Sequence, residues 1–197
     1  ALLLDCTSGD PATSKVIAEL LRQEDVAFVD APVSGGVKGA EEGTLTVMCG
    51  GDAAAFETMR PVALAFSRAV PGGGESGAGQ LAKMVNQIAV AGLVQALAEA
   101  IAFGRRAGLD MGQMLEVIGK GAAQSWQMDN RGATMLEGRF DFGFAVDWMR
   151  KDLGLVLDEA RRNGAQLPVT ALVDQFYADL QAEGGGRWDT SSLIKRL

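Results

Sequence analysis

The chain has 197 residues, of which 48% are hydrophobic and 22% charged, and its formal net charge is −7. This composition is typical of a globular protein with a sizeable core and excludes a disordered chain, and the acidic balance argues against nucleic-acid binding. Histidine is absent, which excludes histidine-based triads, histidine–zinc sites and a histidine general base. No cysteine or carboxylate cluster has metal-ligand spacing, so no metal site is expected.

The cysteines and the hydrophobic segments indicate in which cellular compartment the protein is expected. Cys6 and Cys49 stand in apolar segments and are interpreted as buried free thiols rather than a disulfide framework. No segment has 18 uninterrupted apolar residues and no signal peptide is recognisable, so we expect no membrane partner and a cytoplasmic location. The first residue is not Met, and residues 1–5 already resemble a buried strand, so the chain is expected to begin inside a domain.

The first third of the chain alternates predicted strands and helices. This order favours an α/β layer with mainly parallel pairing. Strands are expected at 2–4, 26–30, 45–49 and 69–70, helices at 11–23 and 53–66, and a strand-end loop at 31–36. Residues 71–74 (PGGG) are the best domain boundary.

Everything after this boundary is predicted to be helical. The central element is a long helix over 77–104, which is apolar on nearly every face from Ile88 to Phe103 and therefore expects neighbours on all sides. Further helices are expected at 111–119, around 124–128, and at 147–163, 168–182 and 190–197, with Asp110 and Asp189 as caps. The predicted fold class is an α/β layer followed by an all-α domain built on one long central helix.

Three polar side chains share one face at the start of the long helix. Lys83, Asn86 and Gln87 stand at positions i, i+3 and i+4, just before the apolar stretch. A lysine near a binding site can act as general acid or base, and neighbouring amides can hold a hydroxyl, carbonyl or carboxylate. A solvated lysine at a helix end, and an Asn86 that bonds to another helix, are the alternatives that the sequence leaves open.

Ser34, Gly35 and Gly36 follow a predicted strand. Two consecutive glycines allow backbone N–H groups to point into a concavity, and Ser34 adds a hydroxyl, which together can hold a carboxylate without an arginine. A tight turn without any ligand is the alternative.

Two weaker motifs lie elsewhere. In Lys151-Asp152-Leu153, Asp152 suits the positive N-terminal end of a helix, whereas Lys151 needs another partner. Thr7 and Ser8 follow the carboxyl end of a predicted strand, where ligands of open α/β sheets bind. An ordinary charged helix start and a plain capped turn would look the same.

Taken together, these segments resemble the β-hydroxyacid dehydrogenase family, in its 3-hydroxyisobutyrate dehydrogenase and tartronate semialdehyde reductase branch. Residues 5–11 (DCTSGDP) are similar to the family's D-x-S-T-x-x-P turn, and residues 30–51 (DAPVSGGVKGAEEGTLTVMCGG) match its substrate loop almost completely. Residues 77–87 (GAGQLAKMVNQ) match the start of its catalytic helix, and residues 151–153 match its K-D-L motif. The order and spacing fit along the whole chain.

The resemblance implies an oxidoreductase that transfers a hydride between NAD or NADP and a small 3-hydroxy acid or its semialdehyde. The implied roles are proton exchange with the substrate oxygen by Lys83, a grip on the substrate carboxylate by Ser34, Gly35 and Gly36, orientation of the substrate by Asn86 or Gln87, and contact with the cofactor by Thr7, Ser8 and Lys151. It does not name the acid: 3-hydroxyisobutyrate, tartronate semialdehyde, succinic semialdehyde, serine and threonate all present a carboxylate near an oxygen.

One departure from the family matters. The G-x-G-x-x-G turn that joins the first strand of the family's dinucleotide-binding fold to a helix is missing, because the Gly-rich runs at 35–36 and 72–74 do not follow a first strand. Residues 1–73 are therefore interpreted as the C-terminal part of a Rossmann-like NAD(P)-binding domain, and residues 74–197 as the all-helical C-terminal domain. We expect the chain to be two-thirds of an enzyme of about 290 residues, and to bind NAD(P) poorly and be inactive by itself.

The resemblance also implies a homodimer or homotetramer built through the helical domain. A non-catalytic relative that serves as an oligomerisation or ligand-binding module is the main alternative, although a scaffold has no need of Lys83 together with the Ser34–Gly36 loop. An imine reductase of the same superfamily ranks below it, because such proteins tend to lack both the lysine and the carboxylate loop.

Overall fold

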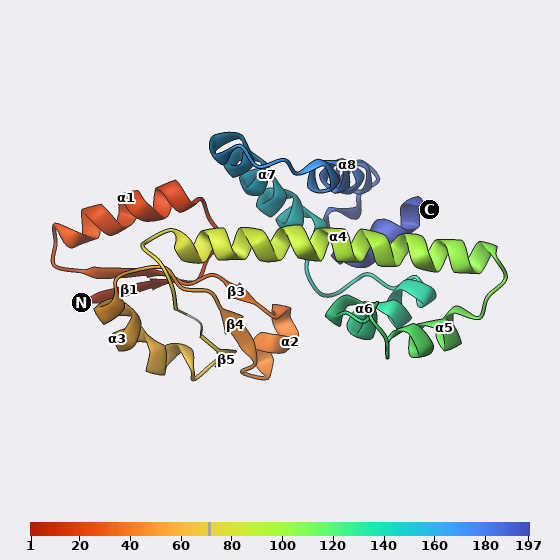
Figure 1. Cartoon of the computed structure of the whole chain (residues 1–197), viewed down its shortest axis with the longest axis horizontal. Helices are drawn as coiled ribbons and strands as arrows, with labels where there is room; N and C mark the ends of the chain where they lie inside the picture. The colour runs from red at the N-terminus through yellow and green to blue at the C-terminus, as the bar shows by residue number, and fades with distance from the viewer. Residues whose placement is uncertain (71) are drawn as a thin grey trace. The chain divides into compact units, whose positions relative to one another are not determined.

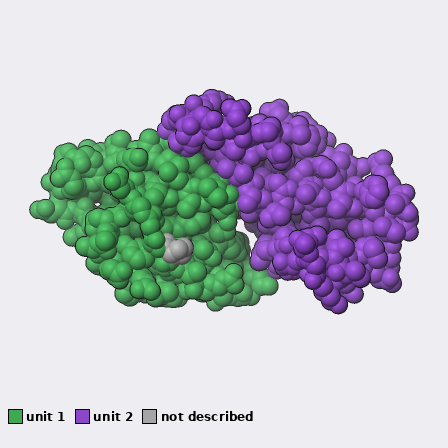
Figure 2. All heavy atoms as spheres, in the orientation of Figure 1, with its two compact units in different colours: residues 1–86 green, residues 87–197 purple. Residues whose placement is uncertain are grey.

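The computed structural model describes residues 1–70 and 72–197, which form two compact units, 1–86 and 87–197 (Figure 2). One helix, α4 (Ala78–Arg106), contributes its first turns to unit 1 and the remainder to unit 2 (Figure 1). The division falls later in the chain than the predicted boundary at 71–74, because the first turns of α4 are bonded to unit 1. Pro71, the first residue of that boundary, lies outside the described residues.

Unit 1 has the predicted α/β character, with two small sheets. In one, β1 (Leu2–Asp5) and β2 (Ala27–Asp30) pair in parallel. In the other, β4 (Leu45–Val47) pairs antiparallel with β3 (Val33–Ser34) and parallel with β5 (Ser67–Ala69). An antiparallel bridge between Asp30 and Gly50 connects the two. The pairing is thus mixed, because β3 reverses direction inside the segment that was expected to be a loop.

The helices of unit 1 are α1 (Pro11–Arg22), α2 (Gly36–Glu41) and α3 (Ala53–Ala63). Asp10 and Asp52 cap α1 and α3, each accepting a backbone N–H three residues ahead at 2.9 Å. Helix α2 was not predicted, since two glycines in six residues weaken any helical signal. The core between the sheets and α3 is centred on Val29, Val47 and Met59, all fully buried.

Unit 2 is all-helical, as predicted. Beside α4 it contains α5 (Met111–Ile118), α6 (Trp126–Glu137), α7 (Val146–Asn163), α8 (Pro168–Ala182) and two 3-10 segments, Gly185–Arg187 and Thr190–Arg196. Helix α6 extends well beyond the predicted 124–128, because Ser125 caps it and Gly138, in the left-handed conformation, ends it.

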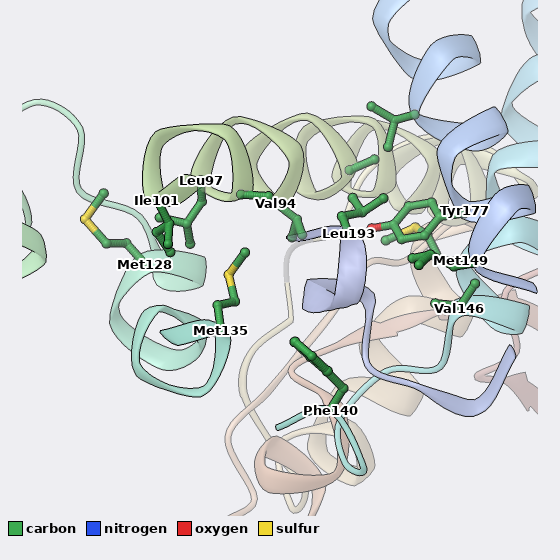
Figure 3. Packing of buried hydrophobic residues seen from close by; sticks show 14 of the residues in the cluster. Val94, Leu97, Ile101, Met128, Met135, Phe140, Val146, Met149, Tyr177 and Leu193 are labelled. Carbon is green, nitrogen blue, oxygen red and sulfur yellow. The ribbon is translucent and has the colours of Figure 1, made fainter. Parts of the chain in front are cut away.

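The core of unit 2 lies along the buried side of α4 (Figure 3). Side chains from α4, α6, α7, α8 and the last 3-10 segment meet there, among them Val94, Ile101, Met135, Met149, Tyr177 and Leu193, each at most 1% exposed. The hydroxyl of Tyr177 donates to the carbonyl of Thr190 at 3.3 Å, which satisfies the polar end of a buried aromatic side chain.

Helix α4 is the one helix among residues 1–70 and 72–197 that is long and apolar enough to span a membrane by length and composition. Counting uninterrupted apolar residues missed it, because isolated polar residues interrupt an 18-residue window of mean hydropathy 1.5. Of that window 44% is buried inside the protein, and the core helix of a globular protein meets the same criterion.

Candidate functional site

The start of α4 is fixed to unit 1 by a buried carboxylate. Asp30, at the end of β2, is fully buried and accepts the N–H groups of Gly77 at 2.7 Å and Gln80 at 3.0 Å. Burial raises the pKa of Asp30, while these backbone hydrogen bonds act in the opposite direction. A carboxylate at this position satisfies N–H groups that the first turn of a helix leaves without partners.

Glycines permit the close approach of α4. A Cβ on Gly79 would lie 2.5 Å from the carbonyl oxygen of Met48 and 2.6 Å from that of Asp30. A Cβ on Gly50 would lie 2.7 Å from the backbone nitrogen of Ala78. Both glycines are therefore required by backbone-to-backbone packing, which holds the first turn of α4 in one place relative to β2.

Lys83 lies one turn further along the same face of α4. Its side chain is 8% exposed, and its Nζ donates to the carbonyl oxygen of Val33 at 2.9 Å. Val33 immediately precedes Ser34, so the amine lies beside the glycine loop rather than in solvent. The solvated lysine that the sequence left open is not what the structure contains.

Asn86, one further turn along, contacts the loop directly. The Ser34 hydroxyl lies 3.4 Å from Asn86 Oδ1. Gly35 and Gly36 follow with φ values of +133° and +64°, which L side chains rarely adopt, so the chain can turn from β3 into α2. The predicted substrate residues Ser34, Gly35, Gly36 and Asn86 thus lie with Lys83 in unit 1, while their grip on a carboxylate stays a prediction.

Gln80 is a site residue that the sequence analysis missed. It is 1% exposed, its Oε1 accepts the N–H of Gly9 at 2.8 Å, and its Nε2 donates to the carbonyl of Thr7 at 2.9 Å. These bonds tie the loop that contains Thr7 and Ser8 to the helix that carries Lys83. The three-residue spacing between Gln80 and Lys83 was the available signal, since it places both on one face.

The loop at Thr7 and Ser8 has a fixed conformation of its own. The backbone N–H and the hydroxyl of Thr7 both donate to Asp5 Oδ1, at 3.0 and 2.8 Å, and Ser8 is half-buried. The loop follows the carboxyl end of β1 in a parallel pair, the place where α/β sheets bind dinucleotides. Its hydroxyl and peptide groups can hydrogen-bond a ligand there, while contact of Thr7 and Ser8 with a cofactor stays a prediction.

The remaining predicted residues belong to unit 2. Gln87 is 3% exposed and donates through Nε2 to Asp152 Oδ2 at 2.6 Å, while Lys151 Nζ lies 2.8 Å from Asp152 Oδ1. Asp152, which is 4% exposed, is therefore the partner that Lys151 was expected to need. No role in a site was predicted for Asp152, yet it contacts two residues that the resemblance had singled out.

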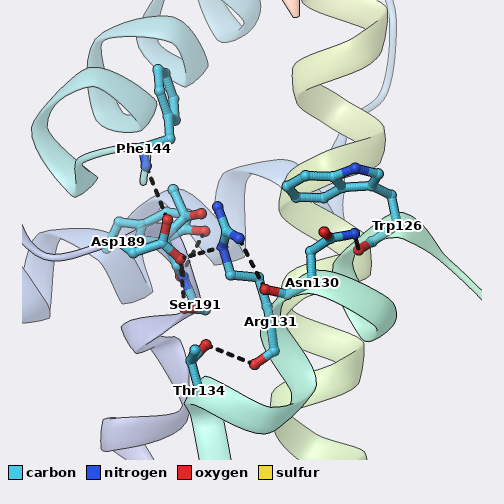
Figure 4. A network of polar contacts seen from close by, with 9 residues as sticks. Trp126, Asn130, Arg131, Thr134, Phe144, Asp189 and Ser191 are labelled. Carbon is cyan, nitrogen blue, oxygen red and sulfur yellow. Dashed lines mark hydrogen bonds and ion pairs between the residues drawn. The ribbon is translucent and has the colours of Figure 1, made fainter. Parts of the chain in front are cut away.

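Unit 2 also contains a buried polar network that no motif indicated (Figure 4). Asp189, fully buried, accepts from Arg131 Nε at 3.0 Å and from the N–H of Phe144 at 2.9 Å. The Arg131 guanidinium lies over the ring of Trp126, 5.0 Å from its centroid. Among the residues that the structure describes, no group of three or more cysteine and carboxylate side chains could hold a metal ion.

Two protein-family models together match the sequence from residue 1 to residue 197. Residues 1–91 match the NAD-binding domain of 6-phosphogluconate dehydrogenase, and residues 77–197 match the NAD-binding model of NADP-dependent 3-hydroxyisobutyrate dehydrogenase. The matches overlap at the start of α4, which is where Gln80, Lys83 and Asn86 lie. The cofactor of this family is NAD or NADP.

Individual proteins agree with the models. An uncharacterised oxidoreductase from Shewanella frigidimarina is 60% identical over all 197 residues, which cover 68% of its length. A 2-(hydroxymethyl)glutarate dehydrogenase from Eubacterium barkeri is 37% identical over 195 residues, covering 98% of this chain and 65% of that protein. The crystal structure of a 3-hydroxyisobutyrate dehydrogenase from Salmonella typhimurium superposes with a TM-score of 0.89 at 33% identity, covering all of this chain and 69% of its own. The chain belongs to the β-hydroxyacid dehydrogenase family.

Proposed function

We propose that this chain is the substrate-binding and proton-transferring part of an NAD(P)-dependent oxidoreductase that acts on a small 3-hydroxy acid or its semialdehyde. The observation that carries the proposal is the position of Lys83: a buried amine, bonded to the carbonyl of Val33, directly beside the Ser34–Gly36 loop. The naming of its relatives as hydroxy-acid dehydrogenases supports the general reaction.

Each residue has a distinct task in this proposal. Bound NAD(P) supplies or accepts the hydride. Ser34, Gly35 and Gly36 bind the substrate carboxylate through a hydroxyl and N–H groups, and Lys83 takes the hydroxyl proton on oxidation or returns it on reduction. Asn86, in contact with Ser34, orients the substrate, which places its reacting oxygen at the amine.

Gln87 and Lys151 have a supporting part in the proposal. Asp152 pairs with both, so it fixes the amide of Gln87 and the ammonium of Lys151 in unit 2. We expect Lys151 to contact the nicotinamide end of the cofactor, and Asp152 to orient the Lys151 side chain through their ion pair. Thr7 and Ser8 are the other residues proposed to contact the cofactor.

The test requires a protein of full family length. Such a protein can be made by joining to this chain, in its natural order, the remaining third of the Shewanella frigidimarina relative. We expect it to reduce NAD+ or NADP+ with at least one member of a panel of 3-hydroxy acids. Lys83→Met should lower kcat by about 10²–10⁴-fold while the acid still binds, because general acid–base catalysis is lost.

Lys120→Met is the matched control, since Lys120 is exposed and lies in the turn after α5. Its kcat should equal that of the parent protein. A Lys83→Met variant as active as this control would refute the proton-transfer role. No activity with any acid or either cofactor would favour a non-catalytic relative instead.

We further propose that unit 2 binds a second copy of the chain through α4. Ala89, Leu93, Ala96, Ala100 and Phe103 are all exposed, Phe103 at 74%. Their spacing of four, three, four and three residues is that of a seam between two helices, and the alanines permit close approach. Light scattering should report a dimer or tetramer for the parent and a smaller species for Phe103→Glu.

A reducing compartment, the cytoplasm, suits the proposed enzyme. Cys6 and Cys49 are both free thiols, one exposed and one buried. An exposed free cysteine is unusual in an oxidising environment.

A further inference from the structure

The Gln80 side chain accepts one hydrogen bond and donates another, and its amide has both the acceptor and the donor that this requires. One end accepts from the N–H of Gly9 and the other donates to the carbonyl of Thr7. A backbone N–H can only donate and a carbonyl can only accept, so these partners fix the orientation of the amide. The two bonds hold the backbone on either side of Ser8, at Thr7 and at Gly9.

Gln80 also has a fixed place on its own helix. Its backbone N–H is bonded to Asp30, whose carboxylate holds the first turn of α4, and Lys83 follows three residues later. Gln80 therefore bonds the loop at residues 7–9 to the same part of α4 that carries the amine of Lys83. At 1% exposure, the Gln80 amide is shielded from water that would compete for its bonds.

We infer that Gln80 is a positioning residue that sets the distance between the cofactor-binding loop and the catalytic lysine. This inference rests on the proposed function for its kinetic consequence, but its structural part concerns residues 7–9 alone. Hydride transfer and proton transfer take place on adjacent atoms of one substrate, so the cofactor and the amine have to be held in one register. Loosening the loop should weaken the cofactor's placement and leave the substrate carboxylate's site intact.

The variant Gln80→Met removes both hydrogen bonds and keeps the length of the side chain. Gln95→Met is a matched control: Gln95 is another buried glutamine of α4, at 7% exposure, and its Nε2 bonds to Glu99 rather than to a loop. Gln80→Glu keeps the acceptor for Gly9 but places a carboxylate oxygen against the Thr7 carbonyl. All three are to be made in the full-length enzyme.

We expect Gln80→Met and Gln80→Glu to raise the KM for NAD(P) by about tenfold and to lower kcat, with the KM for the acid within about twofold of the parent. Hydrogen–deuterium exchange of the peptide containing residues 7–9 should be faster in both variants. Gln95→Met should match the parent in the kinetic constants and in that peptide.

A cofactor KM in Gln80→Met equal to that of Gln95→Met would overturn the inference. So would equal rises in both KM values together with a lower Tm, since that pattern reports a general loss of structure. If the parent enzyme has no activity, the proposed function fails, but exchange still decides the structural part: unchanged exchange at residues 7–9 refutes it, and faster exchange supports it.

Discussion

The carboxylate of Asp189 lies 3.0 Å from Nε of Arg131, although 58 residues separate the two in sequence. The same carboxylate accepts the N–H groups of Phe144 and Ser191 (Figure 4). The ion pair therefore joins α6, the loop before α7 and the last 3-10 segment of unit 2.

Removing this carboxylate should destabilise the protein strongly. We expect Asp189→Ala to lower the free energy of unfolding by about 3–5 kcal/mol, because Arg131 and several N–H groups lose a buried partner. Urea denaturation at neutral pH measures this. Asp158→Ala is the control: its carboxylate pairs with Arg161 at the surface, and its effect should stay within about 0.5 kcal/mol.

A second prediction concerns the close packing of the first turn of α4 at Gly79. Gly79→Ala would place its Cβ against backbone oxygens of Met48 and Asp30, which cannot move aside as a side chain can. We expect a loss of about 3 kcal/mol or more, or failure to fold.

Gly154→Ala is the contrasting variant, because a Cβ at Gly154 of α7 has nothing within 4 Å beyond its own stretch of helix backbone. It should stabilise the protein by about 0.5–1 kcal/mol, as replacing glycine inside a helix does. Thermal denaturation of both variants distinguishes a specific steric requirement at Gly79 from a general sensitivity to alanine. Equal Tm values would contradict the packing argument.

The sequence predicted these arrangements unevenly, for physical reasons. Helical periodicity placed Lys83 and Asn86 on one face, because side chains three residues apart project alike. Nothing local indicated that Asp30, in a strand, would bond to the start of α4, since contacts across the fold depend on how elements pack. Gln80 was passed over for the same reason: its partners lie more than 70 residues earlier.

Short elements were predicted less well than long ones. Strand β3 has two residues, and α2 has six with two glycines, so neither leaves a periodic pattern to detect. The turn from β3 to α2 depends instead on positive φ at Gly35 and Gly36, which the two adjacent glycines allow but do not specify.

The contact between Ser34 and Asn86 gives a third prediction. We expect Ser34→Ala and Asn86→Ala each to lower kcat/KM for the acid by about tenfold or more, since each removes a polar group that the proposed function assigns to the substrate. Because the two side chains touch, the double variant should lose less than the sum, by about 0.5–1 kcal/mol of transition-state stabilisation. Strict additivity in the full-length enzyme would show that they act on separate parts of the substrate.

Asp152 provides a fourth prediction, on stability. In Asp152→Ala the buried amide of Gln87 loses its acceptor and Lys151 loses its counter-charge, so unfolding should become easier by about 2–3 kcal/mol. Asp152→Asn keeps an acceptor oxygen and should cost less. If both variants unfold at the same urea concentration as the parent, Asp152 does not hold the other two residues in place.

Thiol reactivity gives the last prediction, with a defined pH dependence. Burial, followed by the charge of Asp30, raises the pKa of Cys49 to about 12, so the protonated thiol, which reacts slowly, predominates at neutral pH. The thiolate, which is the reactive form, is therefore a very small fraction of the molecules at pH 8. Cys6 is exposed, so a thiol reagent should modify one cysteine in the native protein and two in denaturant.

In Cys6→Ser, the modification rate of Cys49 should rise about tenfold for each pH unit between 7 and 10, since the thiolate fraction rises in that proportion. A rate that equals that of a small free thiol at pH 7 and levels off above about pH 9 would mean that Cys49 is not buried among β2, β4 and α3.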